Sequence, residues 1–244
     1  MKRFLALLAV GAACLALTIS AAPQTLPVLY DSSIKTLAPK ASSAEVSRVY
    51  EELLRVGGTQ IKNQCFDGKL PPTPTLSRLA RGAFTRKGSS QTAWLFESCG
   101  TKRYQDSGFY GLVIVENQRV VRVSSVQLTS VYGFASEFYG VRDINLNGTD
   151  ELALVWGSAD GGGSIGVLAL LEQTPKSLGA LGQVHVYQSD GTDMDRKPVI
   201  SDWKVYVIKG NSPVFIATPK SGVGAPVRLS LDKPELELQT FLTR

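Results

Sequence analysis

The segment DINLNGTDELALVW, residues 143–156, places an oxygen-bearing side chain at every second position of a loop and then enters an apolar run. Gly148 lies within the loop, at a point where a tight turn favours a residue without a Cβ. A polar turn followed by aliphatic and aromatic residues is typical of a strand entering a sheet. The segment therefore predicts β structure, and its loop is the first candidate for a functional site.

The same pattern occurs earlier in the chain. AFTRKGSSQTAWLF, residues 83–96, aligns with the first segment without a gap, at an offset of 60 residues, with Gly88 on Gly148 and Gln91 on Glu151. A weaker third copy, VIKGNSPVFIAT, places Gly210 62 residues after Gly148. Self-similarity at a near-constant period is the signature of repeat architectures. We therefore expect a β-repeat domain.

Short apolar runs separated by Gly, Asn, Pro and Asp continue from residue 82 to the end of the chain. Their length and their β-branched and aromatic content predict a mainly β, antiparallel fold over residues 82–244. Within GLVIVENQRVVRV, residues 111–123, a hairpin is expected around Asn117 and Gln118.

One helix is predicted before the strands, in SSAEVSRVYEELLRVGG, residues 42–58. Ser42 and Glu45 have the spacing of a capping box, an apolar stripe follows, and Gly57-Gly58 is expected to end the helix. LPPTPT, residues 70–75, reads as a stiff connector, so residues 42–81 form a helix and Pro-rich connector. Residues 23–41 show no sustained period and are expected to be an exposed leader.

The first 22 residues have the three parts of a signal peptide: a positive start, an apolar middle and a small-residue exit. We therefore expect an exported protein, either secreted, periplasmic or in the cell envelope, that is not transmembrane after processing. A retained membrane anchor and a lipid on Cys14 are alternatives. Removing residues 1–22 takes away Lys2 and Arg3 and no acidic residue, so the formal charge falls from +5 to +3. So small an excess of positive charge, without a long run of Lys and Arg, argues against nucleic-acid binding.

Two cysteines remain after processing, Cys65 and Cys99. In an exported chain such a pair predicts a disulfide bond. Closing the loop between these two cysteines would contribute roughly 3 to 4 kcal/mol to the free energy of unfolding in the chain-entropy model.

The loop of residues 143–151 offers oxygens where a hard cation can use them. Counted from the first residue they fall at alternate positions, supplied by Asp143, Asn145, Asn147, the Thr149 carbonyl and Glu151. Ca²⁺ takes about six to eight oxygen ligands, which tight loops can supply in this way. With two carboxylates in the set, the expected dissociation constant is on the order of 10⁻⁴ to 10⁻³ M, the range of extracellular modules.

The intervening side chains have expected directions as well. Ile144 and Leu146 can turn toward the core, and Asp150 should face solvent or a neighbouring loop. Two alternatives remain open: an Asx-rich turn without an ion, and an N-glycosylation site at Asn147. An EF-hand is excluded because position 12 is Leu154 rather than a bidentate Glu.

The loop DINLNGTDE resembles those of the FG-GAP family, repeats found in integrin α-chain propellers and related exported bacterial proteins. The resemblance implies a propeller-like arrangement of antiparallel repeats and a calcium ion held between strands of one blade. Three copies are too few for an ordinary closed propeller, so a barrel and a sandwich stay open as alternatives. It carries over Asp143, Asn145, Asn147, Thr149 and Glu151 as the metal ligands. The copy at residues 83–96 departs from the pattern through its basic loop residues and is expected to bind no cation.

Two weaker patterns suggest a rival function, a secreted hydrolase. GGSIG, residues 162–166, matches the G-x-S-x-G motif with Ser164 as its nucleophile, and Asp190, Asp193 and Asp195 form an acidic run. The only histidine, His185, is expected to be a strand residue. No convergent catalytic set emerges, so the leading hypothesis is an exported, calcium-binding β-repeat protein that binds an unknown extracellular or envelope ligand.

Overall fold

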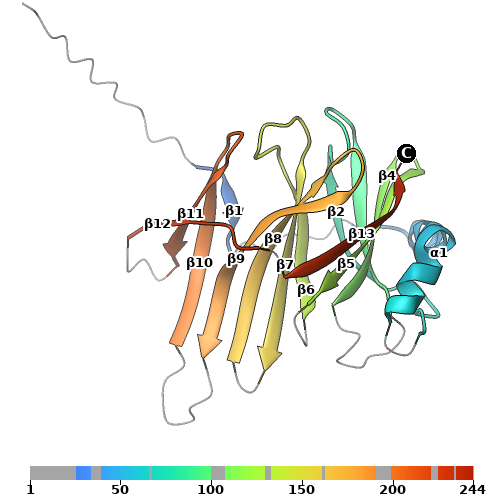
Figure 1. Ribbon diagram of the computed structural model, residues 1–244, viewed down its shortest axis with the longest axis horizontal. Helices are drawn as coiled ribbons and strands as arrows, with labels where there is room; N and C mark the ends of the chain where they lie inside the picture. Colours follow the sequence, from blue (N-terminus) through green and yellow to red (C-terminus); the bar gives the residue numbers. More distant parts are fainter. Residues whose placement is uncertain are drawn as a thin grey trace, which may run out of the picture.

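The computed structural model describes residues 26–33, 40–65, 68–99, 108–129, 133–160, 163–190, 199–220, 225–233 and 235–243. The expected signal peptide, residues 1–22, lies outside them. The described residues form two antiparallel sheets and one helix (Figure 1), so the prediction of a mainly β, antiparallel fold with one helix is confirmed, although one short strand, β1, precedes the helix. Both sheets remain open within this part of the chain, because each strand order runs between two ends and does not close on itself.

The smaller sheet has five strands in the order β13-β5-β4-β3-β2. Their bounds are β2 Leu76–Gly82, β3 Gln91–Glu97, β4 Phe109–Glu116, β5 Arg119–Leu128 and β13 Leu236–Thr243. Asn117 and Gln118 have φ values of 48° and 64° and join β4 to β5. This confirms the predicted hairpin, since a two-residue turn with both central φ positive matches the twist of the strands.

The larger sheet has eight strands, β12-β11-β10-β9-β8-β7-β6, with β1 pairing on β10. Their bounds are β1 Val28–Tyr30, β6 Phe134–Val141, β7 Glu151–Asp160, β8 Gly163–Gln173, β9 Leu178–Asp190, β10 Val199–Ile208, β11 Val214–Pro219 and β12 Val227–Leu229. Strand β10 pairs with β9 through its first residues and with β11 and β1 through its last. The first half of β10 therefore continues the layer formed by β6–β9, and its second half belongs to the layer formed with β1, β11 and β12.

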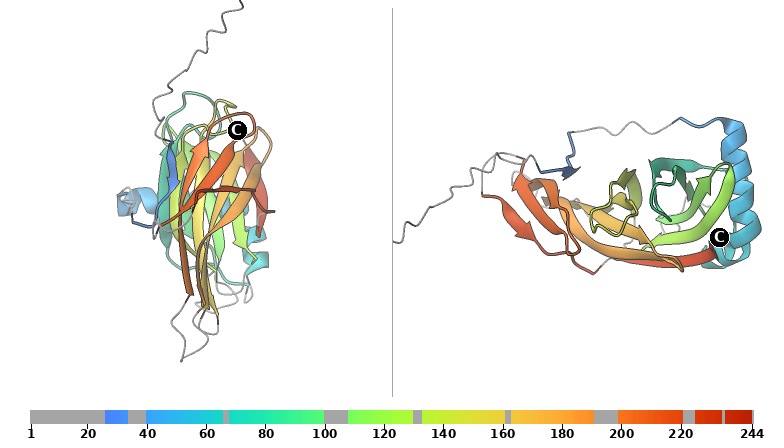
Figure 2. Two further views of the ribbon diagram at one scale, coloured as in Figure 1. Left: turned by 90° about the vertical axis from the view of Figure 1, so that its left-hand side faces the viewer. Right: turned by 90° about the horizontal axis from the view of Figure 1, so that it is seen from above.

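Among the described residues, three apolar cores lie between these layers, and Figure 2 shows the helix and the sheets following one another in a row. The first lies between helix α1 and the smaller sheet, the second between the two sheets, and the third between β7–β9 and the strands β1, β10 and β11. Alternate residues of β7 serve two cores: Leu152 and Leu154 face the smaller sheet, whereas Ala153 and Val155 face the third core. Burial on both faces explains why this strand reads as a continuous apolar run.

Helix α1, Ser43–Gln64, begins at the predicted capping box. The Ser42 side chain accepts from the Glu45 backbone N–H, and the Glu45 carboxylate accepts from the Ser42 backbone N–H. The expected stop at Gly57-Gly58 is wrong, because the helix continues through both glycines. A Cβ on Gly57 would lie 2.6 Å from Phe241 Cδ2 of β13. The glycine is therefore a packing residue that lets an aromatic ring lie against the helix.

Two other boundaries differ from expectation. Part of the expected leader forms β1, in which Leu29 and Tyr30 are buried against the third core. Strand β2 begins at Leu76, inside the region expected to be a connector. Three-residue and edge strands carry too little periodicity to be recognised from sequence, so tertiary pairing decides them.

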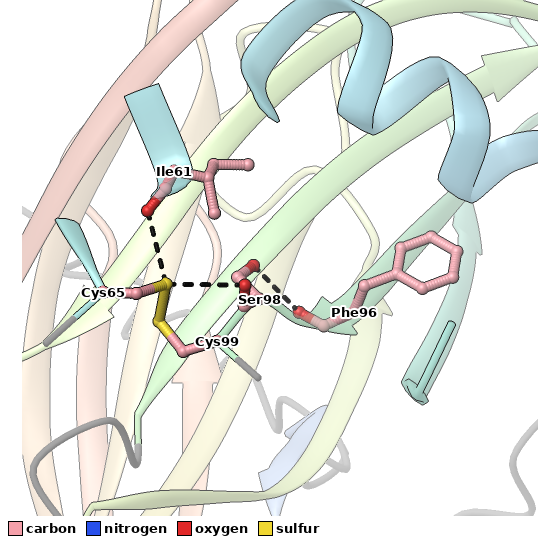
Figure 3. The surroundings of a disulfide bond; sticks show 5 residues. All are labelled: Ile61, Cys65, Phe96, Ser98 and Cys99. Atoms are coloured by element: carbon pink, nitrogen blue, oxygen red, sulfur yellow. Dashed lines mark hydrogen bonds between the residues drawn. A yellow bond between two sulfur atoms is a disulfide. The ribbon is translucent and has the colours of Figure 1, made fainter. Parts of the chain in front are cut away.

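The predicted disulfide is present between Cys65 and Cys99 (Figure 3). Cys65 is the C-cap of α1, and Cys99 follows the end of β3. Cys65 Sγ lies 3.3 Å from the Ile61 carbonyl oxygen and 3.6 Å from that of Ser98. The bond therefore joins the end of the helix to the sheet on which it packs.

Candidate functional site

The candidate site is the loop between β6 and β7. Its backbone turns sharply, with positive φ at Asp143, Leu146 and Gly148 (35°, 59° and 92°). Side-chain oxygens hold the turn: Asn145 Oδ1 accepts from the Asn147 N–H at 3.1 Å, and Asp143 Oδ2 accepts from the Gly148 N–H at 3.2 Å. Such bonds are the reason that Asn and Asp favour turns. Ile144 is fully buried as expected, whereas Leu146 is 56% exposed, contrary to expectation.

Two carboxylates of the loop carry an oxygen without a partner. Glu151 is fully buried; its Oε2 accepts from the Ile144 N–H at 2.8 Å, but Oε1 has no hydrogen bond. Asp143 Oδ1 is likewise buried and unpaired. Burial raises the pKa of Glu151 to about 7, and the carboxylates of Asp143 and Glu172 add to the shift, whereas the Ile144 hydrogen bond opposes it. Both oxygens thus lack the positive partner that a buried carboxylate needs.

Glu172, near the end of β8, is a residue of this site that sequence reasoning missed. Its Oε1 accepts from Asn145 Nδ2 at 2.9 Å and also from Asn147 Nδ2. Glu172 lies on β8, whereas the loop lies between β6 and β7, so no rule of sequence spacing connects the residue to the loop. A charged residue at the end of the apolar run VLALLEQ was the only available signal.

The five predicted ligands thus divide into two groups. Asp143 and Glu151 carry the unpaired buried oxygens, while the amide nitrogens of Asn145 and Asn147 face Glu172. The Thr149 hydroxyl and backbone N–H each donate to Asn147 Oδ1 at 2.7 Å. An amide oxygen has two lone pairs, and these two bonds use both, so Asn147 Oδ1 can coordinate a cation only when the Thr149 hydroxyl turns its hydrogen elsewhere. Both ends of the exposed Asn147 side chain make hydrogen bonds within the chain, so a glycan on Nδ2 would compete with its bond to Glu172.

The loop contacts the corresponding loops of both neighbouring segments. Asp150 Oδ2 accepts from the Ala83 N–H at 2.8 Å and the Asp150 N–H donates to the Ala83 carbonyl at 3.0 Å, so Asp150 faces a neighbouring loop. On the other side the Gly210 N–H donates to the Ile144 carbonyl at 3.0 Å. The three segments aligned in the sequence therefore meet at their loops.

In the loop of the first segment, residues 83–96, Gln91 occupies the position equivalent to Glu151, and its hydrogen bonding differs. Gln91 is buried like Glu151, but its Oε1 accepts from the Thr85 N–H at 2.9 Å. Its Nε2 donates to Thr85 Oγ1 at 2.6 Å and to Glu116 Oε2 at 3.2 Å. Every polar atom of this neutral side chain is paired, so this loop has no need of a cation.

The hydrolase motif does not have the required context. Ser164 lies inside β8 and pairs with both β7 and β9, whereas a nucleophile elbow needs a strand-to-helix turn. His185 is exposed on β9, opposite Val167 rather than Ser164. Asp193 and Asp195 lie outside the described residues, as does the side chain of Asp190.

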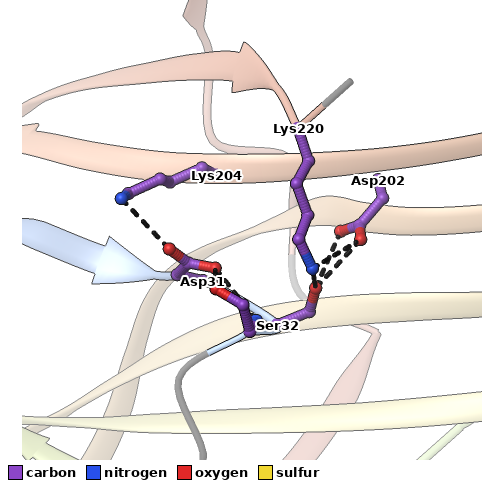
Figure 4. A network of polar contacts seen from close by, with 6 residues as sticks. Asp31, Ser32, Asp202, Lys204 and Lys220 are labelled. Atoms are coloured by element: carbon purple, nitrogen blue, oxygen red, sulfur yellow. Dashed lines mark hydrogen bonds and ion pairs between the residues drawn. The ribbon is translucent and has the colours of Figure 1, made fainter. Parts of the chain in front are cut away.

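A second polar cluster, which sequence reasoning missed, fastens the N-terminal segment to β10 and β11 (Figure 4). Lys204 pairs with Asp31 at 3.0 Å, and Lys220 lies 3.2 Å from Asp202 and 2.6 Å from Ser32 Oγ. A serine–lysine pair can act as nucleophile and base only if the lysine is neutral. Here Lys220 is ion-paired, and the Ser32 hydroxyl donates to the Asp202 carboxylate. The cluster therefore has a structural role: it holds the N-terminal segment against β10 and β11.

Comparison with protein-family models, curated proteins and solved structures gave no match. Among the described residues, no helix is long and apolar enough to cross a membrane. The same residues contain no group of three or more His, Cys, Asp or Glu side chains placed to hold a metal ion. Any cation at the loop must therefore draw on amide and carbonyl oxygens besides its two carboxylates, as loop sites for calcium do.

Proposed function

We propose that this chain is an exported β-repeat module that binds a calcium ion in the loop between β6 and β7. The observation that carries the proposal is the pair of buried, unpaired carboxylate oxygens, Asp143 Oδ1 and Glu151 Oε1. Two carboxylates brought together in a buried place are costly unless a cation or a proton neutralises them. A hard divalent cation removes that cost and suits oxygen donors.

Asp143 and Glu151 are the anionic ligands in this proposal. The amide oxygens of Asn145 and Asn147 and the carbonyl of Thr149 complete the protein's share of the coordination shell. Glu172 holds the two asparagines by their amide nitrogens, which orients their oxygens and supplies further negative charge nearby. Bound calcium supplies a fixed positive charge at the point where the three loops meet.

The role as an exported module rests on other features. The signal-like residues 1–22 and the Cys65–Cys99 disulfide suit an oxidising compartment outside the cytosol. The FG-GAP resemblance of the loop, and the contacts between successive loops, support three copies of one β-repeat. In this proposal the ion stiffens the repeats, and the module binds an extracellular or envelope ligand.

A calcium titration followed by NMR tests the site directly, since amide shifts locate weak binding. We expect saturable shifts in residues 143–151, with a dissociation constant on the order of 10⁻⁴ to 10⁻³ M, and at least a tenfold loss of affinity in Asp143→Asn. Asp150→Asn is the matched control, because Asp150 faces the neighbouring loop and should leave affinity unchanged. Absence of shifts in the loop, or equal loss in both variants, would overturn the proposal.

A further inference from the structure

Arg122 is a buried cation far from the loop just described. It lies on β5, in alternation with Ser124 and Val126, and its side chain crosses toward the turn between β8 and β9. There Nη2 donates to the Thr174 carbonyl at 2.9 Å and approaches that of Pro175 at 3.5 Å. Only 3% of the residue is exposed. The guanidinium thus lies at the end of the core between the two sheets.

Most of this guanidinium is unpaired. Nε and Nη1 are buried and have no hydrogen-bond partner. Burial lowers the pKa of Arg122, and no carboxylate among the described residues contributes an opposing effect. Arginine stays charged in proteins, so it cannot relieve this burial by losing a proton. An isolated buried charge is unfavourable unless an opposite charge accompanies it.

Gln173, at the end of β8, is a second buried residue with unsatisfied polar atoms. It directly precedes Thr174, whose carbonyl Arg122 contacts, and lies two residues beyond Leu171 of the inter-sheet core. The residue is 4% exposed, yet neither its amide nitrogen nor its amide oxygen has a partner. Buried polar groups without partners are rare in native proteins and indicate an ion or water that completes them.

The surrounding hydroxyl groups are already engaged. Ser124 Oγ and Thr240 Oγ1 lie 3.3 Å apart, joining β5 to β13, and Thr240 Oγ1 accepts from the Leu178 N–H at 2.8 Å. The polar groups that still lack a partner therefore belong to Arg122 and Gln173. Most of them are N–H donors, and the only charge among them is that of the guanidinium.

We propose that Arg122 and Gln173 form a buried binding site for a small monovalent anion, a halide ion or a compact carboxylate. The anion accepts hydrogen bonds from Nε and Nη1 of Arg122 and from the Gln173 amide, and its charge neutralises the guanidinium. Charge-assisted bonds of this kind are stronger than neutral ones. The occupied site would link the smaller sheet to the β8–β9 turn of the larger one.

Thermal melts of the purified protein at constant ionic strength, pH and calcium concentration test the proposal, with the sodium salts of chloride, formate or acetate compared with bulky gluconate. We expect a saturable rise in Tm with at least one small anion, since ligands that bind only the folded state stabilise it. A response to chloride alone identifies a halide site, whereas a stronger response to formate or acetate identifies a carboxylate site.

Arg122→Met should abolish the anion-dependent rise, and Gln173→Leu should weaken it. Arg119→Met is the matched control, because it removes the same charge from an exposed position on the same strand and should retain the full response. The proposal is overturned if the small anions act no differently from gluconate on the parent protein, which would point to buried water. It is also overturned if Arg122→Met folds and keeps the response.

Discussion

Gln91 and Glu151 each begin a strand after a tight polar loop, and each is buried, but only Gln91 has all of its polar atoms paired. The Glu151 side chain differs from a glutamine only in having a second oxygen in place of the amide NH2 group. That oxygen, Oε1, is the atom left without a partner. The neutral residue is satisfied by its own loop, whereas the acidic one needs a proton or a cation.

The stability of the calcium-free protein should therefore depend on pH through Glu151. Its pKa is about 7 in the folded protein, above the ordinary 4.5, so between these values the folded state holds a proton that the unfolded state has released. The free energy of unfolding should fall as pH rises through this interval, by about 3 kcal/mol at roughly 1.4 kcal/mol per pKa unit. Urea unfolding in chelator at pH 5 and pH 8 measures the change.

Glu151→Gln should lack this contribution, so the comparison between the two proteins isolates Glu151 from other titrating groups. An identical pH dependence in both would show that Glu151 ionises normally in the folded state.

Substitutions at the two helix glycines should have opposite effects. Gly57→Ala should destabilise the protein by about 1 to 3 kcal/mol, because the new Cβ would lie 2.6 Å from Phe241 and force the ring to move. At Gly58 the nearest atom, Leu54 Cβ, is 3.6 Å away. Gly58→Ala should therefore stabilise the helix by roughly 0.5 to 1 kcal/mol. Equal effects at the two positions in urea unfolding would contradict the packing role of Gly57.

The Cys65–Cys99 bond should contribute substantially to stability. Replacing both cysteines with alanine should lower the free energy of unfolding by roughly 3 to 4 kcal/mol in the chain-entropy model. Parent protein treated with reductant should lose a similar amount, while reductant should leave the double variant unchanged. Mass spectrometry of the unreduced protein after alkylation gives an independent check, since labelling of both thiols would refute the bond.

Contact between the first two loops should depend on the acceptor at Asp150. Asp150→Ala removes the acceptor of the half-buried Ala83 N–H and should cost about 1 kcal/mol, the net contribution of a typical hydrogen bond. Asp150→Asn keeps an oxygen acceptor and should cost clearly less. If urea unfolding shows equal losses, the bond does not hold the loops together.

Local sequence signals predicted the helix start, the Asn117-Gln118 hairpin and the strand-rich remainder, because capping, turn chemistry and apolar runs act over a few residues. They failed where distant residues decide the structure. The helix passes Gly57 because Phe241, from the far end of the chain, packs there. Strand β1 forms because β10 offers it an edge.

The candidate site shows the same division. The loop spacing predicted Asp143 and Glu151 as an acidic pair, and the structure finds an unpaired buried oxygen on each. Glu172 could not be predicted, because its approach to Asn145 depends on how β8 pairs with β7. Arg122 likewise gave no signal, since its burial depends on the packing of one sheet on the other.

The most direct test of the calcium site is a thermal melt of the parent protein and of Glu151→Gln at pH 7.5, each in chelator and in millimolar calcium. In chelator the variant should melt at or above the parent temperature, because it buries no unpaired charge. Calcium should then raise the Tm of the parent protein and leave the variant nearly unchanged, reversing their order. An equal response to calcium in both proteins, or none in either, would contradict a calcium site at Glu151.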